Sequence, residues 1–205
     1  MNHDSETSPT SSAKGRIAIL GSGRGSNARA ILEAIKTGQL SAEVALILTD
    51  QPAAGILDIA SEYNVPSLVV DPGDRKRGHL SDEAIQLITD RLCEAGVEWV
   101  ILAGFMKIVR DPLLSRFENR ILNLHPSLLP RYPGLHTVKR AMEAGEKETG
   151  CTIHLVDSGI DTGKILHQSR VPIEPGDTVA SVTAKIHAAE HKAYPMVIGK
   201  LIKQG

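Results

Sequence analysis

Short, mostly apolar runs alternate along this chain with segments whose apolar residues recur at helical spacing, and this alternation restricts the fold more than any other feature. Four runs have the length and character of buried strands: residues 17–20, 44–48, 67–70 and 99–103. Three segments with helical spacing follow the first three runs: residues 28–35, 55–63 and 82–95. This order predicts an α/β fold, a single Rossmann-like domain with a mostly parallel sheet and helices on both faces.

The second half of the chain continues the pattern and then changes it. Six further elements are predicted: a short helix at 111–117, a strand at 121–123, a helix at 138–144, strand-like runs at 151–156 and 165–171, and a helix from about Thr178 to the end. No internal repeat or linker-like segment divides the chain. We therefore expect one domain over residues 15–205, preceded by a polar, disordered tail at residues 1–14.

Composition and charge argue against several classes of function. The chain has 205 residues, of which 41% are hydrophobic, enough for one sizeable core. A net charge of −1 and an aromatic content of 3% argue against nucleic-acid binding. Cys93 and Cys151 form no CxxC pair, so we expect neither a disulfide nor a zinc site. Without a secretory signal or membrane span, a cytoplasmic protein is expected, and a homodimer is left open.

A polar pair interrupts the fifth predicted strand. Asn123 and His125 follow an apolar run and precede Pro-Ser-Leu-Leu-Pro, whose prolines prevent the strand from continuing. The pair thus lies where a buried strand becomes a loop, a common place for catalytic groups in open α/β sheets. An amide donor beside an imidazole suits a reaction that develops an oxyanion and moves a proton. The plainer alternative is a turn with a capping Asn and a structural His.

A glycine-rich loop joins the first predicted strand to the first predicted helix. Residues 21–27, Gly-Ser-Gly-Arg-Gly-Ser-Asn, offer backbone N–H groups at a helix N-terminus, where a phosphate group would be stabilised. Their spacing matches neither the G-x-G-x-x-G dinucleotide fingerprint nor a Walker loop. A tight strand–helix turn is one alternative. A nicotinamide-dependent oxidoreductase is another, because Asp50 ends the second predicted strand, where such enzymes hold a ribose.

Two acids flank a glycine-containing loop after the run at 151–156. A carboxylate beside an imidazole favours the imidazolium form and orients the ring. Asp161, 36 residues after His125, is the candidate partner of that histidine, and Asp157 is the other acid of the loop. A loop-capping role for Asp161 is the alternative, because the sequence alone does not show that the two side chains meet.

These segments together resemble a known family. The string from Asn123 to Thr137, NLHPSLLPRYPGLHT, is similar to the signature of the phosphoribosylglycinamide formyltransferases, the GAR (glycinamide ribonucleotide) transformylases among the folate-dependent formyltransferases. Residues 21–27, 103–109 (AGFMKIV), 153–163 and 190–195 (EHKAYP) are similar to further motifs of that family. The resemblance runs from about Arg16 to the C-terminus.

The resemblance implies an activity and a set of site residues. A formyl group would pass from 10-formyltetrahydrofolate, a co-substrate, to the amine of GAR in purine biosynthesis, with no metal. The implied catalytic residues are Asn123, His125 and Asp161. The implied GAR-binding residues are Gly25, Ser26, Asn27 and Glu190. The implied folate-binding residues are Arg77, Met106, Lys107, Ile108, Val109 and Asn123, with Arg75 as the alternative to Arg77.

Other functions remain open at this point. A tRNA-directed formyltransferase would need an added C-terminal domain, and a formylfolate hydrolase usually carries a regulatory domain before the catalytic one. The nicotinamide oxidoreductase and a catalytically silent ligand-binding module belong to other classes. Thermal-shift titration with folates and nucleotides would separate them.

Overall fold

A computed structural model describes residues 15–73 and 78–204, and its core is one seven-stranded sheet in the order β3-β2-β1-β4-β5-β6-β7. The strands are β1 Gly15–Leu20, β2 Ala42–Thr49, β3 Ser67–Val69, β4 Trp99–Leu102, β5 Ile121–His125, β6 Glu148–Leu155 and β7 Ile165–Pro172. The helices are α1 Ser26–Lys36, α2 Ile56–Glu62, α3 Asp82–Glu94, α4 Leu113–Arg116, α5 Thr137–Glu143 and α6 Val179–Ile202. Each predicted element is present, although α4 is shorter than the expected helix at 111–117, since Pro112 is its N-cap and Phe117 leaves helical geometry.

The first five strands of the sheet are parallel, whereas β6 and β7 are antiparallel to their neighbours. This confirms the predicted α/β fold with a mostly parallel sheet. From β1 the chain builds β2 and β3 on one side and then crosses to β4 on the other side. The loops that follow β1 and β4 therefore diverge at the carboxyl edge of the sheet. Open α/β sheets bind ligands in the crevice at such a point.

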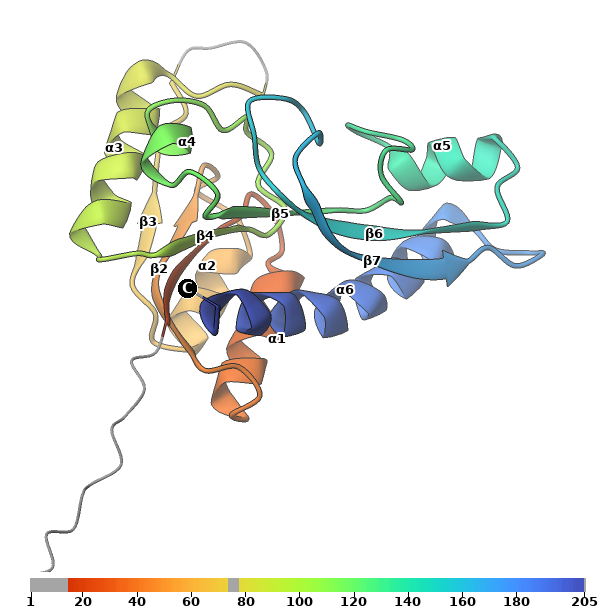
Figure 1. Cartoon of the computed structure of the whole chain (residues 1–205), viewed down its shortest axis with the longest axis horizontal. Coiled ribbons are helices and arrows are strands. Elements are labelled where there is room, and N and C mark those ends of the chain that lie inside the picture. Colours follow the sequence, from red (N-terminus) through yellow and green to blue (C-terminus); the bar gives the residue numbers. More distant parts are fainter. Residues whose placement is uncertain (1–14, 74–77, 205) are drawn as a thin grey trace, which may run out of the picture.

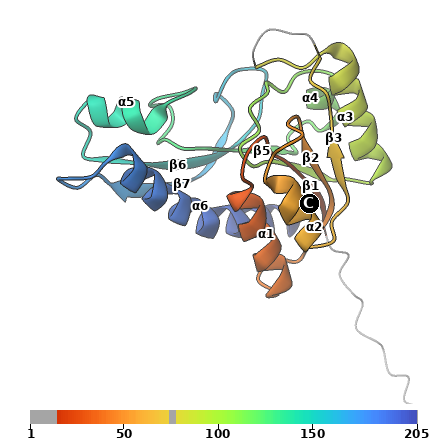
Figure 2. The same cartoon turned by 180° about the vertical axis from the view of Figure 1, so that it is seen from behind.

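Helices cover both faces of the sheet, as the sequence predicts (Figures 1 and 2). One buried apolar cluster joins the sheet to α1, α2 and α6, and a second joins the opposite face to α3 and α4. The strands β1 and β4 contribute alternate residues to the two clusters, so both of their faces are buried. This explains why these strands are apolar throughout rather than alternating.

The last helix, α6, is fixed to the sheet close to its carboxyl edge. Its N-terminus is closed by a capping box, in which Thr178 and Ser181 each accept from the backbone N–H of the other. Near the other end, the buried Tyr194 hydroxyl lies 2.9 Å from the Leu102 carbonyl and 3.2 Å from the Leu122 carbonyl. Because these carbonyls belong to β4 and β5, Tyr194 sets the position of the helix turn that carries Glu190.

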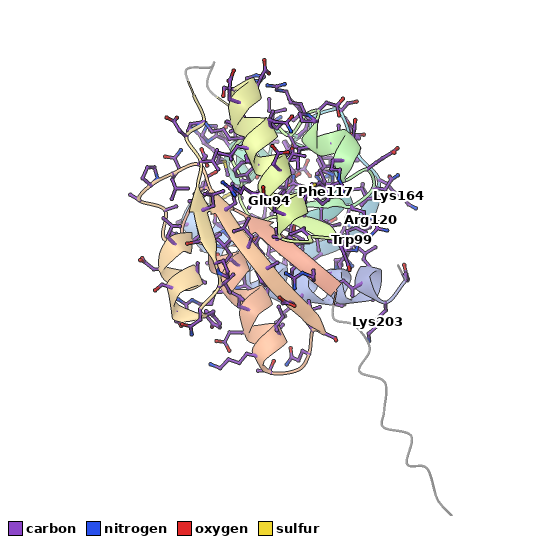
Figure 3. The ribbon with its side chains drawn as sticks, turned by 90° about the vertical axis from the view of Figure 1, so that its left-hand side faces the viewer. Glu94, Trp99, Phe117, Arg120, Lys164 and Lys203 are labelled. Carbon is purple, nitrogen blue, oxygen red and sulfur yellow. The ribbon has the colours of Figure 1, made fainter. Side chains whose placement is uncertain are left out.

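The opposite edge of the sheet, where the parallel strands begin, carries ordinary packing interactions. Figure 3 labels Glu94 at the end of α3, with Trp99 and Arg120 nearby, and the Arg120 guanidinium lies 5.9 Å from the centre of the Trp99 ring. Within residues 15–73 and 78–204, no helix is both long enough and apolar enough to cross a membrane.

Candidate active site

Asn123 and His125 lie on one face of β5 because successive residues of a strand point to opposite faces. The intervening Leu124 belongs to the apolar cluster on the α6 side of the sheet. Asn123 is partly buried and His125 is buried. The Asn-x-His spacing therefore places an amide and an imidazole side by side, as the sequence predicts.

The neighbouring strand β6 adds His154, which sequence reasoning did not assign to the site. His154 lies directly opposite Asn123 in the antiparallel register. Its Nδ1 atom is 2.8 Å from the Leu155 carbonyl, so Nδ1 is a donor and Nε2, 3.2 Å from Asn123 Nδ2, is the acceptor in the neutral ring. The signal was the alternation of Thr152 and His154 with apolar residues, which puts both polar side chains on one face.

Asp161 reaches this face from the loop between β6 and β7. Its backbone is left-handed, with φ of 56°, a conformation that Asp tolerates better than most residues. Gly163 makes the loop possible, because a Cβ atom there would lie 1.8 Å from the Leu155 carbonyl oxygen. The other acid, Asp157, is exposed and accepts from Gly159 and Thr162 within the loop. The structure thus brings Asp161, and not Asp157, to His125.

The Asp161 carboxylate is surrounded by nitrogen atoms. Oδ2 lies 3.2 Å from His125 Nδ1 and accepts from the Gly134 amide at 2.9 Å. Oδ1 lies 3.3 Å from Asn123 Nδ2 and 3.7 Å from His154 Nε2. Burial alone would raise the pKa of Asp161, but interactions with the His154 ring and the Gly134 amide outweigh it and hold the pKa below its usual range. The carboxylate is therefore ionised at neutral pH.

Both ring nitrogens of His125 face oxygen atoms. Nε2 is 2.9 Å from the Tyr132 carbonyl, and Nδ1 faces the Asp161 carboxylate. Only the imidazolium can donate at both positions. The arrangement places an imidazole and an amide donor beside each other, which suits stabilisation of negative charge and transfer of a proton.

The glycine loop ends at the N-terminus of α1, which has no side-chain cap. Gly25 occupies the N-cap position with φ of 77°, and a Cβ atom there would lie 2.9 Å from Ile56 Cα. Gly25 is therefore required by both conformation and space, whereas Ser26 is exposed. A cavity of about 570 Å³ reaches Ser26 and is also lined by Arg24 and Arg29.

Asn27 and Glu190 contact each other behind this loop. Asn27 Nδ2 donates to Glu190 Oε2 at 2.9 Å, whereas Asn27 Oδ1 is buried without a partner among the described residues. Glu190 is almost completely buried. Burial raises the pKa of Glu190, and the hydrogen bond from Asn27 opposes this shift only in part.

The segment after β4 divides its side chains between solvent and core. Met106 is 60% exposed and Ile108 is also exposed, whereas Val109 is buried in the cluster beside α3. Lys107 forms an ion pair with Asp50, with Nζ 3.5 Å from Oδ2. Arg75 and Arg77 lie outside the described residues.

Asp50 is not available to a nicotinamide ribose. It is buried at the end of β2, and its carboxylate also accepts from Ser22 Oγ at 2.5 Å and from Gln51 Nε2 at 2.8 Å. The cluster of Asn123, His125 and Asp161 makes its contacts without Asp50. This geometry disfavours the oxidoreductase alternative.

Comparison with known proteins shows the family of the chain. Residues 15–198 match the family model described as Formyl transferase. The chain belongs to the formyl transferase family. A phosphoribosylglycinamide formyltransferase of Bacillus subtilis is 37% identical over 91% of this chain and 94% of its own length. The solved structure of phosphoribosylglycinamide formyltransferase from Bacillus halodurans is 44% identical, with a TM-score of 0.85 over 91% of this chain and 95% of that one.

Longer members of the formyl transferase family share the same region. The trifunctional purine biosynthetic protein adenosine-3 of Drosophila melanogaster is 42% identical over 91% of this chain, but the chain spans only 14% of its length. A glycinamide ribonucleotide transformylase structure from Symbiobacterium toebii is 41% identical, with a TM-score of 0.87 over 92% of this chain and 88% of that one.

Within this formyl transferase fold, the structure brings the predicted residues together in three places. The three candidate catalytic residues form one cluster with His154. The candidate GAR-binding residues meet where α1 and α6 contact each other, and the described candidate folate-binding residues other than Asn123 lie in the loop after β4. A cavity of about 1070 Å³ between α1 and α6 contains none of the predicted residues.

Proposed function

We propose that this protein transfers a formyl group from 10-formyltetrahydrofolate to the amine of GAR, giving formyl-GAR and tetrahydrofolate in purine biosynthesis. The observation that carries this proposal is the cluster of Asn123, His125 and Asp161 at the carboxyl end of β5. The close similarity to the B. subtilis formyltransferase over nearly its whole length supports the choice of acceptor.

The cluster can perform each step of formyl transfer. The neutral GAR amine attacks the formyl carbon, and a C–N bond forms while the carbonyl oxygen gains negative charge. Asn123 Nδ2 and the His125 imidazolium donate to that oxygen, which displaces the acceptors that they now face, the His154 ring and the Tyr132 carbonyl. The bond to the folate N10 then breaks, the amine loses a proton, and N10 gains one. His125 carries this proton, and Asp161 keeps its ring charged and oriented.

The GAR phosphate binds at the N-terminus of α1. The uncapped N–H groups at Ser26 and Asn27 offer donors and partial positive charge to an anion, and Gly25 allows its close approach. Arg24 adds a positive charge to the neighbouring cavity. Glu190 binds the ribose hydroxyl groups, and Asn27 orients it.

The folate binds beside the end of β5, against the loop after β4. Met106 and Ile108 expose apolar surface there, and an aromatic pterin would cover it. Backbone groups of residues 106–109 recognise the polar edge of the ring, since the side chains of Lys107 and Val109 are already engaged.

The direct test is to incubate the protein with GAR and 10-formyltetrahydrofolate and to detect formyl-GAR by mass spectrometry. His125→Ala should abolish product formation. His167→Ala is the matched control, because His167 lies on β7 with its Nε2 bonded to Ser169. Formate release without GAR would instead indicate a hydrolase, and absence of both products would refute the proposal.

A further inference from the structure

Asp50, the buried acid at the end of β2, links the loop after β1 to the loop after β4. Asp50 accepts from Ser22 Oγ of the loop after β1, and it forms an ion pair with Lys107 of the loop after β4. Ser22 Oγ in turn accepts from the Met106 backbone N–H at 2.9 Å. A continuous chain of polar contacts therefore runs from one loop through Asp50 to the other.

Two further backbone hydrogen bonds hold the glycine loop against its neighbours. The Ser22 N–H donates to the Gly104 carbonyl at 3.1 Å, so the two loops also touch directly. The Ile56 N–H donates to the Gly23 carbonyl at 3.1 Å. The segment from Asp50 to Ile56 thus holds the glycine loop at two adjacent residues, Ser22 and Gly23.

We propose that Asp50 is a positioning residue that couples the GAR subsite to the folate subsite, so that binding of either substrate strengthens binding of the other. This inference rests on the proposed function, which assigns the loop after β1 to GAR and the loop after β4 to the folate. Asp50 itself contacts neither substrate. It acts through Ser22 and Lys107.

The burial of this ion pair gives the coupling its strength. The Asp50 side chain is 1% exposed and the Lys107 side chain is 14% exposed, so water screens their interaction weakly. Both groups have lost hydration, and their mutual attraction offsets part of that cost, because a buried charge without its partner is strongly unfavourable. A ligand that orders one loop therefore also orders the second, and the second ligand meets a site that is already arranged.

Isothermal titration can measure the coupling directly. Tetrahydrofolate, which cannot donate a formyl group, is titrated into the protein with and without saturating GAR. The ratio of the two Kd values is the coupling factor, which we expect to be about fivefold or more in the wild type. Ser22→Ala and Asp50→Ala should bring this ratio close to one, while the Kd of each ligand alone changes less.

A matched control separates coupling from general stability. Glu94→Ala breaks the exposed Arg91–Glu94 ion pair at the opposite edge of the sheet and should keep the wild-type ratio (Figure 3). Ser22→Ala removes one hydroxyl and remains decisive if Asp50→Ala fails to fold. A wild-type ratio of one, or an unchanged ratio in Ser22→Ala, would overturn the inference while formyl transfer by the wild type persists. Failure of the wild type to form formyl-GAR would instead overturn the proposed function.

Discussion

Asp161→Asn tests the central pairing of the site with little disturbance of its shape. Asn has nearly the same volume as Asp and also tolerates the left-handed backbone at this position. Its Oδ1 atom can still accept from the Gly134 amide, so the loop keeps one of its anchors. The substitution therefore removes chiefly the negative charge that faces His125.

The size of the effect follows from the distance and the burial. Two unit charges 3.2 Å apart, as His125 Nδ1 and Asp161 Oδ2 are, attract by about 5 kcal/mol at an effective dielectric constant of about 20. Both side chains are at least nine-tenths buried, so desolvation offsets part of this attraction. A remainder of about 3–4 kcal/mol corresponds to a loss of about 10²–10³ in kcat.

Initial rates of formyl-GAR formation, fitted separately for each substrate, provide the assay. We expect kcat to fall while both KM values stay near those of the wild type, because the imidazolium that Asp161 stabilises contacts the substrate oxygen chiefly in the transition state. Asp157→Asn is the matched control from the same loop. Its carboxylate is exposed and bonds only within that loop, so kcat should not change.

The combination with His125→Ala gives the strictest test. If Asp161 acts through the imidazole, the double variant should be little slower than His125→Ala alone. Additive losses would show that the two residues act independently, and the proton-transfer role of the pair would have to be abandoned. An unchanged kcat in Asp161→Asn would have the same consequence.

Three further outcomes are expected. Gly25→Asp should weaken GAR binding in calorimetric titration far more than folate binding, since its φ is positive and a carboxylate would repel the phosphate. Glu190→Gln should raise KM for GAR yet raise the thermal midpoint, because the new amide can donate to the unpaired Asn27 Oδ1. The pKa of Glu190 is raised on folding, so the stabilisation that Glu190 gives the native protein is present below its unfolded pKa of about 4.3 and is lost as pH rises. Gln does not titrate, so the difference in thermal midpoint between Glu190→Gln and the wild type should grow from acid to neutral pH. Burial raises the pKa of Cys151 to about 11, so iodoacetamide at pH 8 should alkylate Cys93 in the native protein and Cys151 only after unfolding, as peptide mapping can show.

The local pattern of apolar and polar residues was sufficient to predict the strands and the pairing of Asn123 with His125 on one strand face. Continuous apolar runs mark strands covered on both faces, and a spacing of two residues in a strand places Asn123 and His125 on one face. The position of the glycine loop at the N-terminus of α1 was also predictable, because its glycines immediately precede a segment with helical spacing. These features depend on residues that are neighbours in sequence.

The remaining site features depend on register and on long-range contacts that no local pattern encodes. His154 is opposite Asn123 only because β6 is antiparallel to β5 in one particular register. The burial of Glu190 depends on how α6 meets α1, and the ion pair of Lys107 with Asp50 depends on the crossover from β3 to β4. From the sequence, Asp50 had the character of a ribose-binding acid, and only its neighbours show that it supports two loops instead.

The change from parallel to antiparallel strands at β5 explains why the cluster forms there. β6 ends beside the start of β5, with Leu155 opposite Leu122, so the following loop must fold back across the face of the sheet to reach His125. Gly163 permits this return, and the Gly134 amide holds its Asp161 from the other side. One carboxylate thus faces nitrogen atoms of β5, of β6 and of the loop before α5. Loss of any single neighbour leaves Asp161 held by the others. Loss of the carboxylate charge weakens all of these contacts together. A substitution at Asp161 is therefore the sharpest test of the catalytic role of the cluster.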